Sequence, residues 1–189
     1  SADSDEKKMR KVGVIYDTAQ GMDTLVSELS MLSKLSLDKV PFNFEKIKAK
    51  DFFEEYTAYA ADTLGEAGIE FIYNFECDED REINIAPAQF RRVLNNLIDN
   101  SRKYGAEDGT AKIMLSVRNG EDGHTEISIE DNGQGVPADE RDKIFETFYR
   151  GDKARTGHKN GSGLGLAITK QITDRHGASL RADERELGG

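Results

Sequence analysis

The chain has 189 residues, of which 26 are basic and 36 are acidic, so its formal net charge is −10 at pH 7. This acidic balance argues against a surface that binds nucleic acid, and the length favours one domain of ordinary size with an appendage. A single cysteine, Cys77, excludes an internal disulfide framework and suits a reducing cytosol, where we expect it to be a small buried hydrophobe.

No apolar run approaches the length of a membrane span, and no signal peptide opens the chain. We therefore expect a cytoplasmic location and no membrane contact for this piece, while a longer parent protein could be anchored in the plasma membrane.

Residues 7–37 are expected to form one long helix with an apolar seam. Its apolar residues advance by alternating steps of three and four, as in a coiled coil: Met9, Val12, Tyr16, Ala19, Met22, Val26, Leu29 and Leu32. Gly13 and Gly21 each weaken the helix by about 1 kcal/mol relative to alanine. A lone helix cannot bury its own stripe, so we expect another chain or a companion helix to cover it. Packing on the following domain is the alternative.

Strands and helices alternate after Pro41, which is expected to close the long helix. We predict strands at residues 42–47, 69–75, 82–86, 112–117, 125–130 and 179–183, and helices at 51–65, Pro87–Tyr104, 137–148 and 163–176. Asp51 and Glu54 have capping-box spacing, and residues 119–123 are expected to turn a hairpin. This order predicts an α+β two-layer sandwich, in which a mixed sheet has helices on one face. We divide the chain into residues 1–40 and 41–189.

The helix predicted at Pro87–Tyr104 combines a buried face with a polar one. Its apolar residues recur at three- and four-residue steps: Phe90, Val93, Leu94, Leu97 and Ile98. Asn96, Asn100 and Lys103 share another face, within reach of a single ligand. Amide oxygens can coordinate Mg²⁺ and a lysine can neutralise phosphate, which indicates a nucleotide site. Taken alone, the same pattern favours a solvated helix face.

Two glycine-rich turns support the nucleotide interpretation. Asp131 follows a predicted strand, and its carboxylate can accept a hydrogen bond from an exocyclic amine such as that of adenine, while Gly133 and Gly135 allow close approach of the backbone. The second turn opens a helix and presents free N–H groups to phosphate; it comprises Gly161, Gly163, Leu164, Gly165 and Leu166.

Between these turns, residues 151–160 form a polar segment that contains Lys153, Arg155, His158 and Lys159. Such a segment is typical of a mobile lid, and it would supply positive charge that the chain otherwise lacks.

Together these stretches resemble the catalytic and ATP-binding domain of sensor histidine kinases, members of the GHKL superfamily with its Bergerat-type fold, over residues 42–183. The segment from Asn96 to Tyr104 resembles the N box, and residues 144–150 resemble the F box. The two glycine turns resemble the first and second glycine boxes.

The resemblance implies roles for several of these residues. Asn100 would hold Mg²⁺, Lys103 would meet phosphate, and Asp131 would bind the adenine amine. The resemblance further implies that Tyr104 and Arg150 contact the nucleotide, and that Asn96, Lys103 and Arg150 act in catalysis.

The resemblance also implies a reaction and partners. ATP and Mg²⁺ would serve as cofactors, and the γ-phosphoryl group would pass to a histidine and then to an aspartate of a response-regulator receiver domain. The N-terminal helix corresponds to the second helix of the family's dimerisation and phosphoacceptor hairpin, which implies a homodimer in the full-length protein.

The sequence departs from the family pattern in several places. The phosphoacceptor motif, a histidine followed by an acidic residue and soon by Arg-x-Pro, does not occur in the chain. We expect His124, His158 and His176 not to be acceptors, so the chain alone should not phosphorylate itself. Ala86 stands where an aspartate is frequent and Ser101 where alanine is usual, and we expect the family's last strand to be truncated.

Two alternatives remain open at this stage. A hydrolytic ATPase of the same superfamily would need a glutamate as general base four residues before the magnesium asparagine, where this chain has Asn96. A nucleotide-binding docking module without kinase activity would keep the fold but lack the chemistry.

Overall fold

The computed structural model describes residues 2–106, 109–151 and 161–184, with only the backbone described for residues 2–6 and 122. In chain order its elements are α1 (Ala2–Ser36), β1 (Glu45–Lys48), α2 (Ala49–Glu66), β2 (Glu70–Glu76), β3 (Glu82–Ile85), α3 (Pro87–Tyr104), β4 (Lys112–Asn119), η1 (Glu121–Gly123), β5 (Thr125–Asp131), η2 (Lys143–Phe145) and α5 (Gly165–Arg175). None of the helices in the described ranges combines the length and the apolar character needed to span a bilayer.

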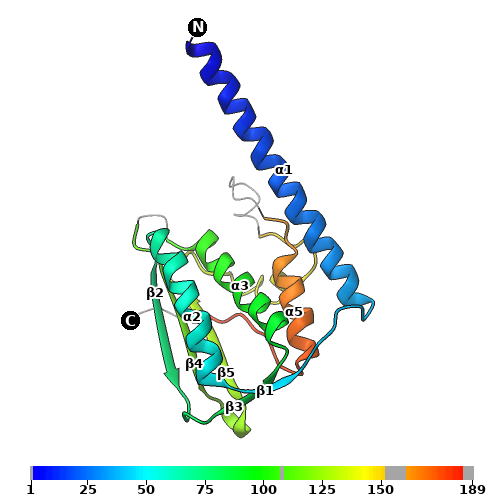
Figure 1. The fold of residues 1–189 in the computed structure, drawn as a ribbon, viewed down its shortest axis with the longest axis vertical. Coiled ribbons are helices and arrows are strands. Elements are labelled where there is room, and N and C mark those ends of the chain that lie inside the picture. Colours follow the sequence, from blue (N-terminus) through cyan, green and yellow to red (C-terminus); the bar gives the residue numbers. More distant parts are fainter. Residues whose placement is uncertain (1, 107–108, 152–160, 185–189) are drawn as a thin grey trace.

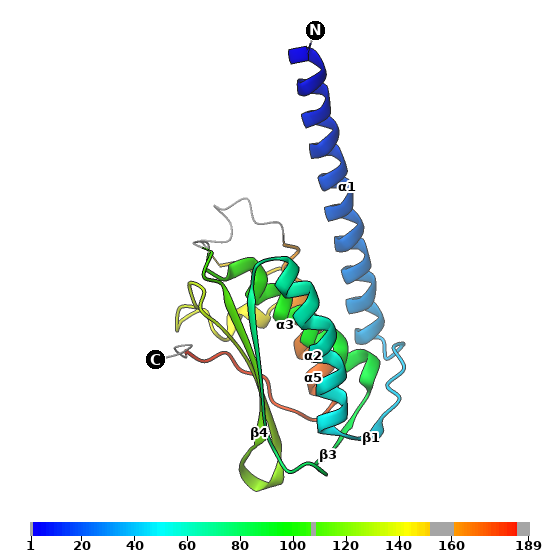
Figure 2. The ribbon, with the colours of Figure 1, turned by 60° about the vertical axis from the view of Figure 1, so that its left-hand side comes forward.

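The main sheet has three strands in the order β2-β4-β5, with β2 parallel to β4 and β4 antiparallel to β5. A separate antiparallel pair joins β1 to β3. Helices α2 and α3 lie on one face of the main sheet, and α5 lies beyond α3 (Figures 1 and 2). The predicted α+β sandwich with a mixed sheet is confirmed.

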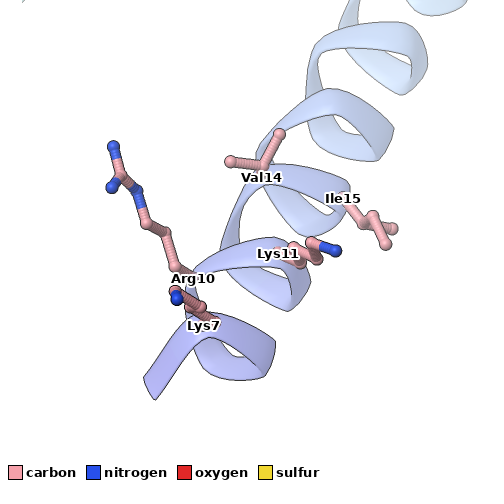
Figure 3. A pocket seen from close by; sticks show the side chains of 5 residues that line it. All are labelled: Lys7, Arg10, Lys11, Val14 and Ile15. Atoms are coloured by element: carbon pink, nitrogen blue, oxygen red, sulfur yellow. The ribbon is translucent and has the colours of Figure 1, made fainter. Parts of the chain in front are cut away.

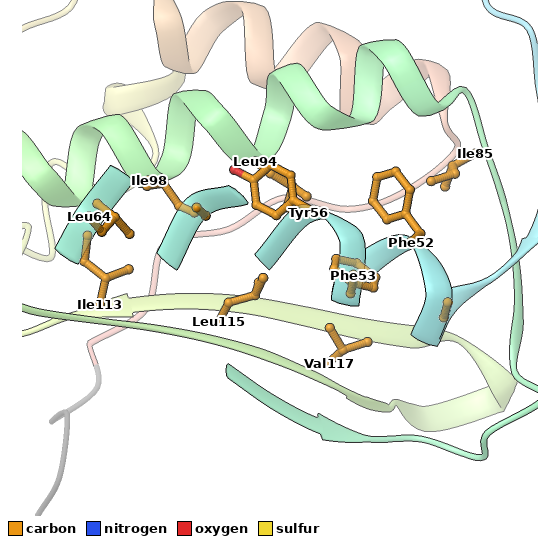
Figure 4. Packing of buried hydrophobic residues seen from close by; sticks show 12 residues of the cluster. Phe52, Phe53, Tyr56, Leu64, Ile85, Leu94, Ile98, Ile113, Leu115 and Val117 are labelled. Carbon is orange, nitrogen blue, oxygen red and sulfur yellow. The ribbon is translucent and has the colours of Figure 1, made fainter. Parts of the chain in front are cut away.

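The main core forms where β4 faces the helices. Alternate residues of β4 point inward, because successive side chains of a strand project to opposite faces. Ile113, Leu115 and Val117 are fully buried against Phe53 of α2 and Leu94 of α3 (Figure 4). Each fully buried aliphatic side chain contributes about 2 kcal/mol of transfer free energy, so this layer fixes α3 over the sheet.

A second apolar cluster lies on the other side of α3. Val93 of α3 packs against Leu164, Ile168 and Ile172 near and within α5, and the end of α1 contributes Leu35. Helix α3 therefore separates two cores, so its polar residues are confined to the narrow edges between them.

Helix α1 projects away from the rest of the molecule over most of its length (Figures 1 and 2). Only its last turns, through Leu32 and Leu35, are buried against α5, while Met22 remains 66% exposed and Val26 63% exposed. Packing on the following domain thus buries the last part of the predicted apolar seam. That a partner covers the rest of the seam stays a prediction. The helix ends at Ser36, five residues before Pro41, in a turn where Asp38 has a φ of 55°.

Three expectations from the sequence were wrong. Residues 137–148 form turns and the short 3₁₀ helix η2 instead of an α-helix. Most of their side chains are exposed, so the segment offers no continuous apolar face. Residues 179–183 form no strand; Arg181 approaches Glu126 of β5 only through its side chain, at 3.9 Å. Helix α2 begins at Ala49, so Asp51 lies within its first turn and does not cap it.

Candidate functional site

The polar edge of α3 faces α5. Pro87 starts α3 at a position where its missing N–H costs nothing. The buried residues of α3 then fix the rotation of the helix and so determine which of its edges faces α5. Asn96 and Asn100 are half-buried on this edge, and Lys103 is exposed in the last turn. The Asn96 side-chain nitrogen donates to the Gly165 carbonyl at 3.0 Å and to Thr169 Oγ1 at 3.3 Å.

Helix α3 is also held from its other side. Tyr56 of α2 donates its hydroxyl hydrogen to Asn95 Oδ1 at 2.9 Å. Burial raises the pKa of this phenol, and the negative charge of Asp99 adds to the effect. The hydroxyl therefore remains a donor across the physiological pH range and helps to set the rotation of α3.

The first glycine turn leaves the end of β5 and folds onto the end of α3. Asp131 is half-buried, and one of its carboxylate oxygens accepts a hydrogen bond from the Gly133 N–H at 3.0 Å. A Cβ atom on Gly133 would lie 2.2 Å from the carbonyl oxygen of Tyr104. Only glycine fits there, so the turn and the end of α3 meet closely. Gly135 has a φ of 68° and needs glycine for its backbone conformation.

Asn132 anchors this turn, a role that the sequence analysis missed. Its side-chain oxygen accepts the Lys112 N–H at 2.8 Å, and its side-chain nitrogen donates to the Thr110 carbonyl at 2.8 Å. These bonds close the turn over the start of β4. Both partners lie twenty or more residues earlier in the chain, so no local pattern around Asn132 indicates these bonds.

The second glycine turn packs on the F-box segment. Gly163 has a φ of 72°, and a Cβ there would lie 3.0 Å from backbone atoms of Phe148 and Tyr149. Its carbonyl accepts the Phe148 N–H at 3.0 Å, while Phe148 itself has a φ of 65° and a side chain that is 56% exposed. Arg150 follows, half-buried. These contacts fix the backbone at Phe148, where the segment 137–148 ends.

Helix α5 begins at Gly165, and no described side chain caps its start. Its first N–H groups and the positive end of its dipole therefore suit an anion. Gly161 lies near the Tyr104 hydroxyl, 3.8 Å from where a Cβ would be placed, and Leu164 is fully buried. Leu166 is half-buried.

Ser162 links the second glycine turn to α1. Its hydroxyl donates to the carboxylate of Glu28 and accepts the Leu164 N–H, the latter at 3.0 Å. This contact between residues far apart in the sequence could not be predicted from local pattern. The predicted lid, with Lys153, Arg155, His158 and Lys159, falls mostly outside the described residues.

His176 has a structural role. Its Nε2 accepts the Ala86 N–H at 3.0 Å, and its Nδ1 lies 2.8 Å from the Ile172 carbonyl, to which it donates. Both ring nitrogens are thus occupied, and the rings of Phe42, Phe44 and Phe90 surround the imidazole. The bond to Ala86 ties the end of α5 to the start of α3. These contacts favour the expectation that His176 is not a phosphoryl acceptor.

The donor set determines what the site could bind. Within the part of the chain that the structure describes, no group of three or more His, Cys, Asp or Glu side chains could hold a metal ion. The available oxygens near α5 are the amides of α3, which suit a hard cation that completes its shell with phosphate and water. The residues therefore fit Mg²⁺ bound together with a nucleotide better than Mg²⁺ alone.

A shallow hollow near the start of α1 is a separate feature (Figure 3). Its lining consists of Lys7, Arg10, Lys11, Val14 and Ile15. All of these belong to one helix, so the hollow is open surface, and it lies far from the glycine turns in both ribbon views (Figures 1 and 2).

Comparison with known proteins shows which family the chain resembles. Residues 85–189 match the family described as histidine kinase-, DNA gyrase B- and HSP90-like ATPase. Sensor histidine kinase WalK of Bacillus subtilis (strain 168) is 36% identical over 176 residues, which are 93% of this chain but only 28% of WalK. The chain thus spans less than a third of that relative.

Solved structures show the same fold. The catalytic domain of histidine kinase ThkA superposes with a TM-score of 0.63 at 23% identity, covering 76% of this chain and 90% of ThkA's domain. A second match is a chain from the structure of ThkA in complex with response regulator protein TrrA. The match covers 92% of our chain and 46% of the chain in that complex, with a TM-score of 0.66 at 19% identity. The chain therefore belongs to the histidine kinase-, DNA gyrase B- and HSP90-like ATPase family.

Proposed function

We propose that this chain binds Mg-ATP between α3, the Asp131 turn and the start of α5, and that it serves as the catalytic part of a protein histidine kinase. The observation that carries the proposal is the meeting of these segments, which lie far apart in the sequence. Asn96 bonds to the Gly165 carbonyl, and Gly133 lies against the Tyr104 carbonyl.

Each part of the site has a role in this proposal. Asp131 Oδ2 accepts a hydrogen bond from the adenine amine, while Oδ1 is held by Gly133. Gly135 lets the backbone approach the adenine base, and Tyr104 contacts the nucleotide.

The phosphates would lie at the second glycine turn and the start of α5. The backbone of residues 161–166 and the positive end of the helix dipole favour negative charge there. Lys103 and Arg150 add positive charge, and Asn100 is the proposed magnesium ligand. A bound Mg²⁺ would offset charge on the phosphate oxygens.

The chemistry favoured by this site is phosphoryl transfer to a positioned acceptor. Such transfer needs alignment and charge stabilisation more than covalent chemistry. A water-activating base is absent from the position of Asn96, since an amide cannot take a proton and its nitrogen already donates to α5. This supports the kinase over a hydrolytic ATPase.

The acceptor histidine and the partners lie outside this chain in our proposal. Residues 1–40 would be the second helix of a dimerisation and phosphoacceptor hairpin, and residues 41–189 the ATP-binding part. The exposed seam of α1 would be covered in a homodimer. By similarity to ThkA, whose structure with TrrA is known, we propose a response-regulator receiver domain as the next phosphoryl acceptor.

Titration calorimetry with Mg-ATP tests the binding site. Asp131→Asn should weaken binding by about 1.5–3 kcal/mol, more than tenfold, because it removes a charged acceptor. Asn100→Ala should weaken Mg-ATP binding and leave metal-free nucleotide binding nearly unchanged. Asp62→Asn, a change of the same kind on the exposed face of α2, is the control. Unchanged affinity in both site variants would contradict the site assignment.

Labelled ATP tests the chemistry. The chain alone should acquire no acid-labile, base-stable label, and a separate hairpin that carries a histidine beside an acidic residue should become labelled. Asn96→Ala or Lys103→Ala should then lower the rate of transfer. Label on the isolated chain would show that one of its own histidines is an acceptor. ATP binding without any transfer to the supplied hairpin would instead favour the docking module.

A further inference from the structure

The side-chain amide of Asn96 has a defined orientation. Its nitrogen faces α5, where the Gly165 carbonyl lies at 3.0 Å and Thr169 Oγ1 at 3.3 Å. A backbone carbonyl can only accept hydrogen bonds, so the NH₂ group and not the oxygen must face Gly165. Both hydrogens of the amide are therefore used.

This orientation leaves Oδ1 as the free end of Asn96. Among the described residues no hydrogen bond reaches that oxygen, and the side chain is half-buried. Oδ1 is thus available as an acceptor toward the proposed Mg-nucleotide, whereas a flipped amide would direct hydrogens there and repel a cation.

Thr169 differs from the other buried threonines in what its hydroxyl contacts. Thr57 and Thr173 donate to carbonyls one turn earlier in their own helices, at 2.7 and 2.8 Å. Thr169, which is 0% exposed, instead accepts from a side chain of a different helix. Because solvent cannot reach the hydroxyl, it can serve as a fixed second anchor for the amide.

We propose that Thr169 is a positioning residue that holds the Asn96 amide with Oδ1 directed at the Mg-nucleotide. Without the hydroxyl, one amide hydrogen loses its partner and Gly165 alone restrains the group. This inference rests on the proposed function, because it assigns a role within the same site.

The test compares two buried threonines of α5. Thr169→Val and Thr173→Val remove the same hydroxyl at positions that are 0% and 7% exposed, and only the first contacts Asn96. Calorimetric titrations measure nucleotide affinity with Mg²⁺ and again in EDTA. Thr169→Val should lose about fivefold in the Mg²⁺-dependent part of the affinity, the equivalent of one hydrogen bond, and nothing in EDTA. Thr169→Ser should restore binding, and Thr173→Val should match the wild type.

A double-mutant cycle separates the loss of the Asn96 contact from any general loss of stability in the variants. In an Asn96→Ala background, Thr169→Val should cause no further loss of Mg²⁺-dependent affinity, since its target is gone. Additive losses, or equal behaviour of Thr169→Val and Thr173→Val in a wild type that binds Mg-ATP, would overturn this inference alone. A wild type that fails to bind Mg-ATP would overturn the proposed function as well.

Discussion

Replacing Gly133 by alanine should both destabilise the protein and weaken nucleotide binding. The added Cβ would lie 2.2 Å from the Tyr104 carbonyl oxygen, well short of the 3.0 Å that real Cβ contacts keep. The neighbouring atom belongs to the backbone at the end of α3, so the turn has to move and the Gly133 bond to Asp131 is lost. Overpacking costs about 1–3 kcal/mol and the hydrogen bond about 1 kcal/mol. We expect a total loss of about 2–4 kcal/mol.

Two other glycines provide the matched comparison. Gly135→Ala meets no atom within 4 Å but has a φ of 68°, so only about 1 kcal/mol of backbone strain is expected. Gly65→Ala in α2 meets neither problem and should stabilise by about 0.5–1 kcal/mol. Urea unfolding gives the free energies, and calorimetry with Mg-ATP should show more than a tenfold loss for Gly133→Ala. Equal effects of Gly133→Ala and Gly135→Ala would refute the steric argument.

Further predictions concern the core and the contacts that join the helices. Leu115→Ala should lower the free energy of unfolding in urea by about 2–5 kcal/mol, whereas Tyr59→Ala at an exposed position should change it by less than about 0.5 kcal/mol. His176→Ala removes the bonds to Ala86 and Ile172 and should cost about 1–3 kcal/mol; a cost no larger than that of the hairpin variant His124→Ala would contradict its structural role. Burial raises the pKa of Tyr73 to about 12, so its contribution to stability is complete below pH 10 or so and is lost as the pH rises toward 12. In Tyr73→Phe, the free energy of unfolding in urea should therefore fall less between about pH 10 and 12 than in the wild type. The same fall in both proteins would count against ionisation of Tyr73 as its cause.

Local patterns were sufficient for the elements that pack through their own periodicity. The bounds of α3 were predicted correctly, because Pro87 marks its start and its apolar residues follow the helical repeat on both sides. The hairpin of β4 and β5 likewise follows from alternation around a turn. At the end of the segment 137–148 the competing interaction was remote, because the Phe148 N–H bonds to the Gly163 carbonyl, fifteen residues later, and not to a carbonyl one helical turn earlier.

The candidate site shows the same division. Asn96, Asn100 and Asp131 stand out as candidates by spacing and chemistry, and their proposed roles rest on the resemblance to the histidine kinase family. The remote contacts of α3 could not be predicted in this way, since Thr169 bonds to Asn96 from within α5 and His176 bonds from the end of α5 to the Ala86 N–H at the start of α3. A buried threonine and a histidine at a helix end carry no distinctive local signal, and only the packing of α5 on α3 reveals their partners.

The central claim is that α3, the Asp131 turn and the start of α5 form one Mg-ATP site. The most direct measurement is a two-dimensional NMR titration of the isotope-labelled chain with Mg²⁺ and a non-hydrolysable ATP analogue. We predict saturable shifts of the Asn96 and Asn100 side-chain amides and of the backbone amides of Gly133 and Gly165. Shifts confined to the basic hollow on α1 around residues 7–15, or no saturable shifts, would contradict the account.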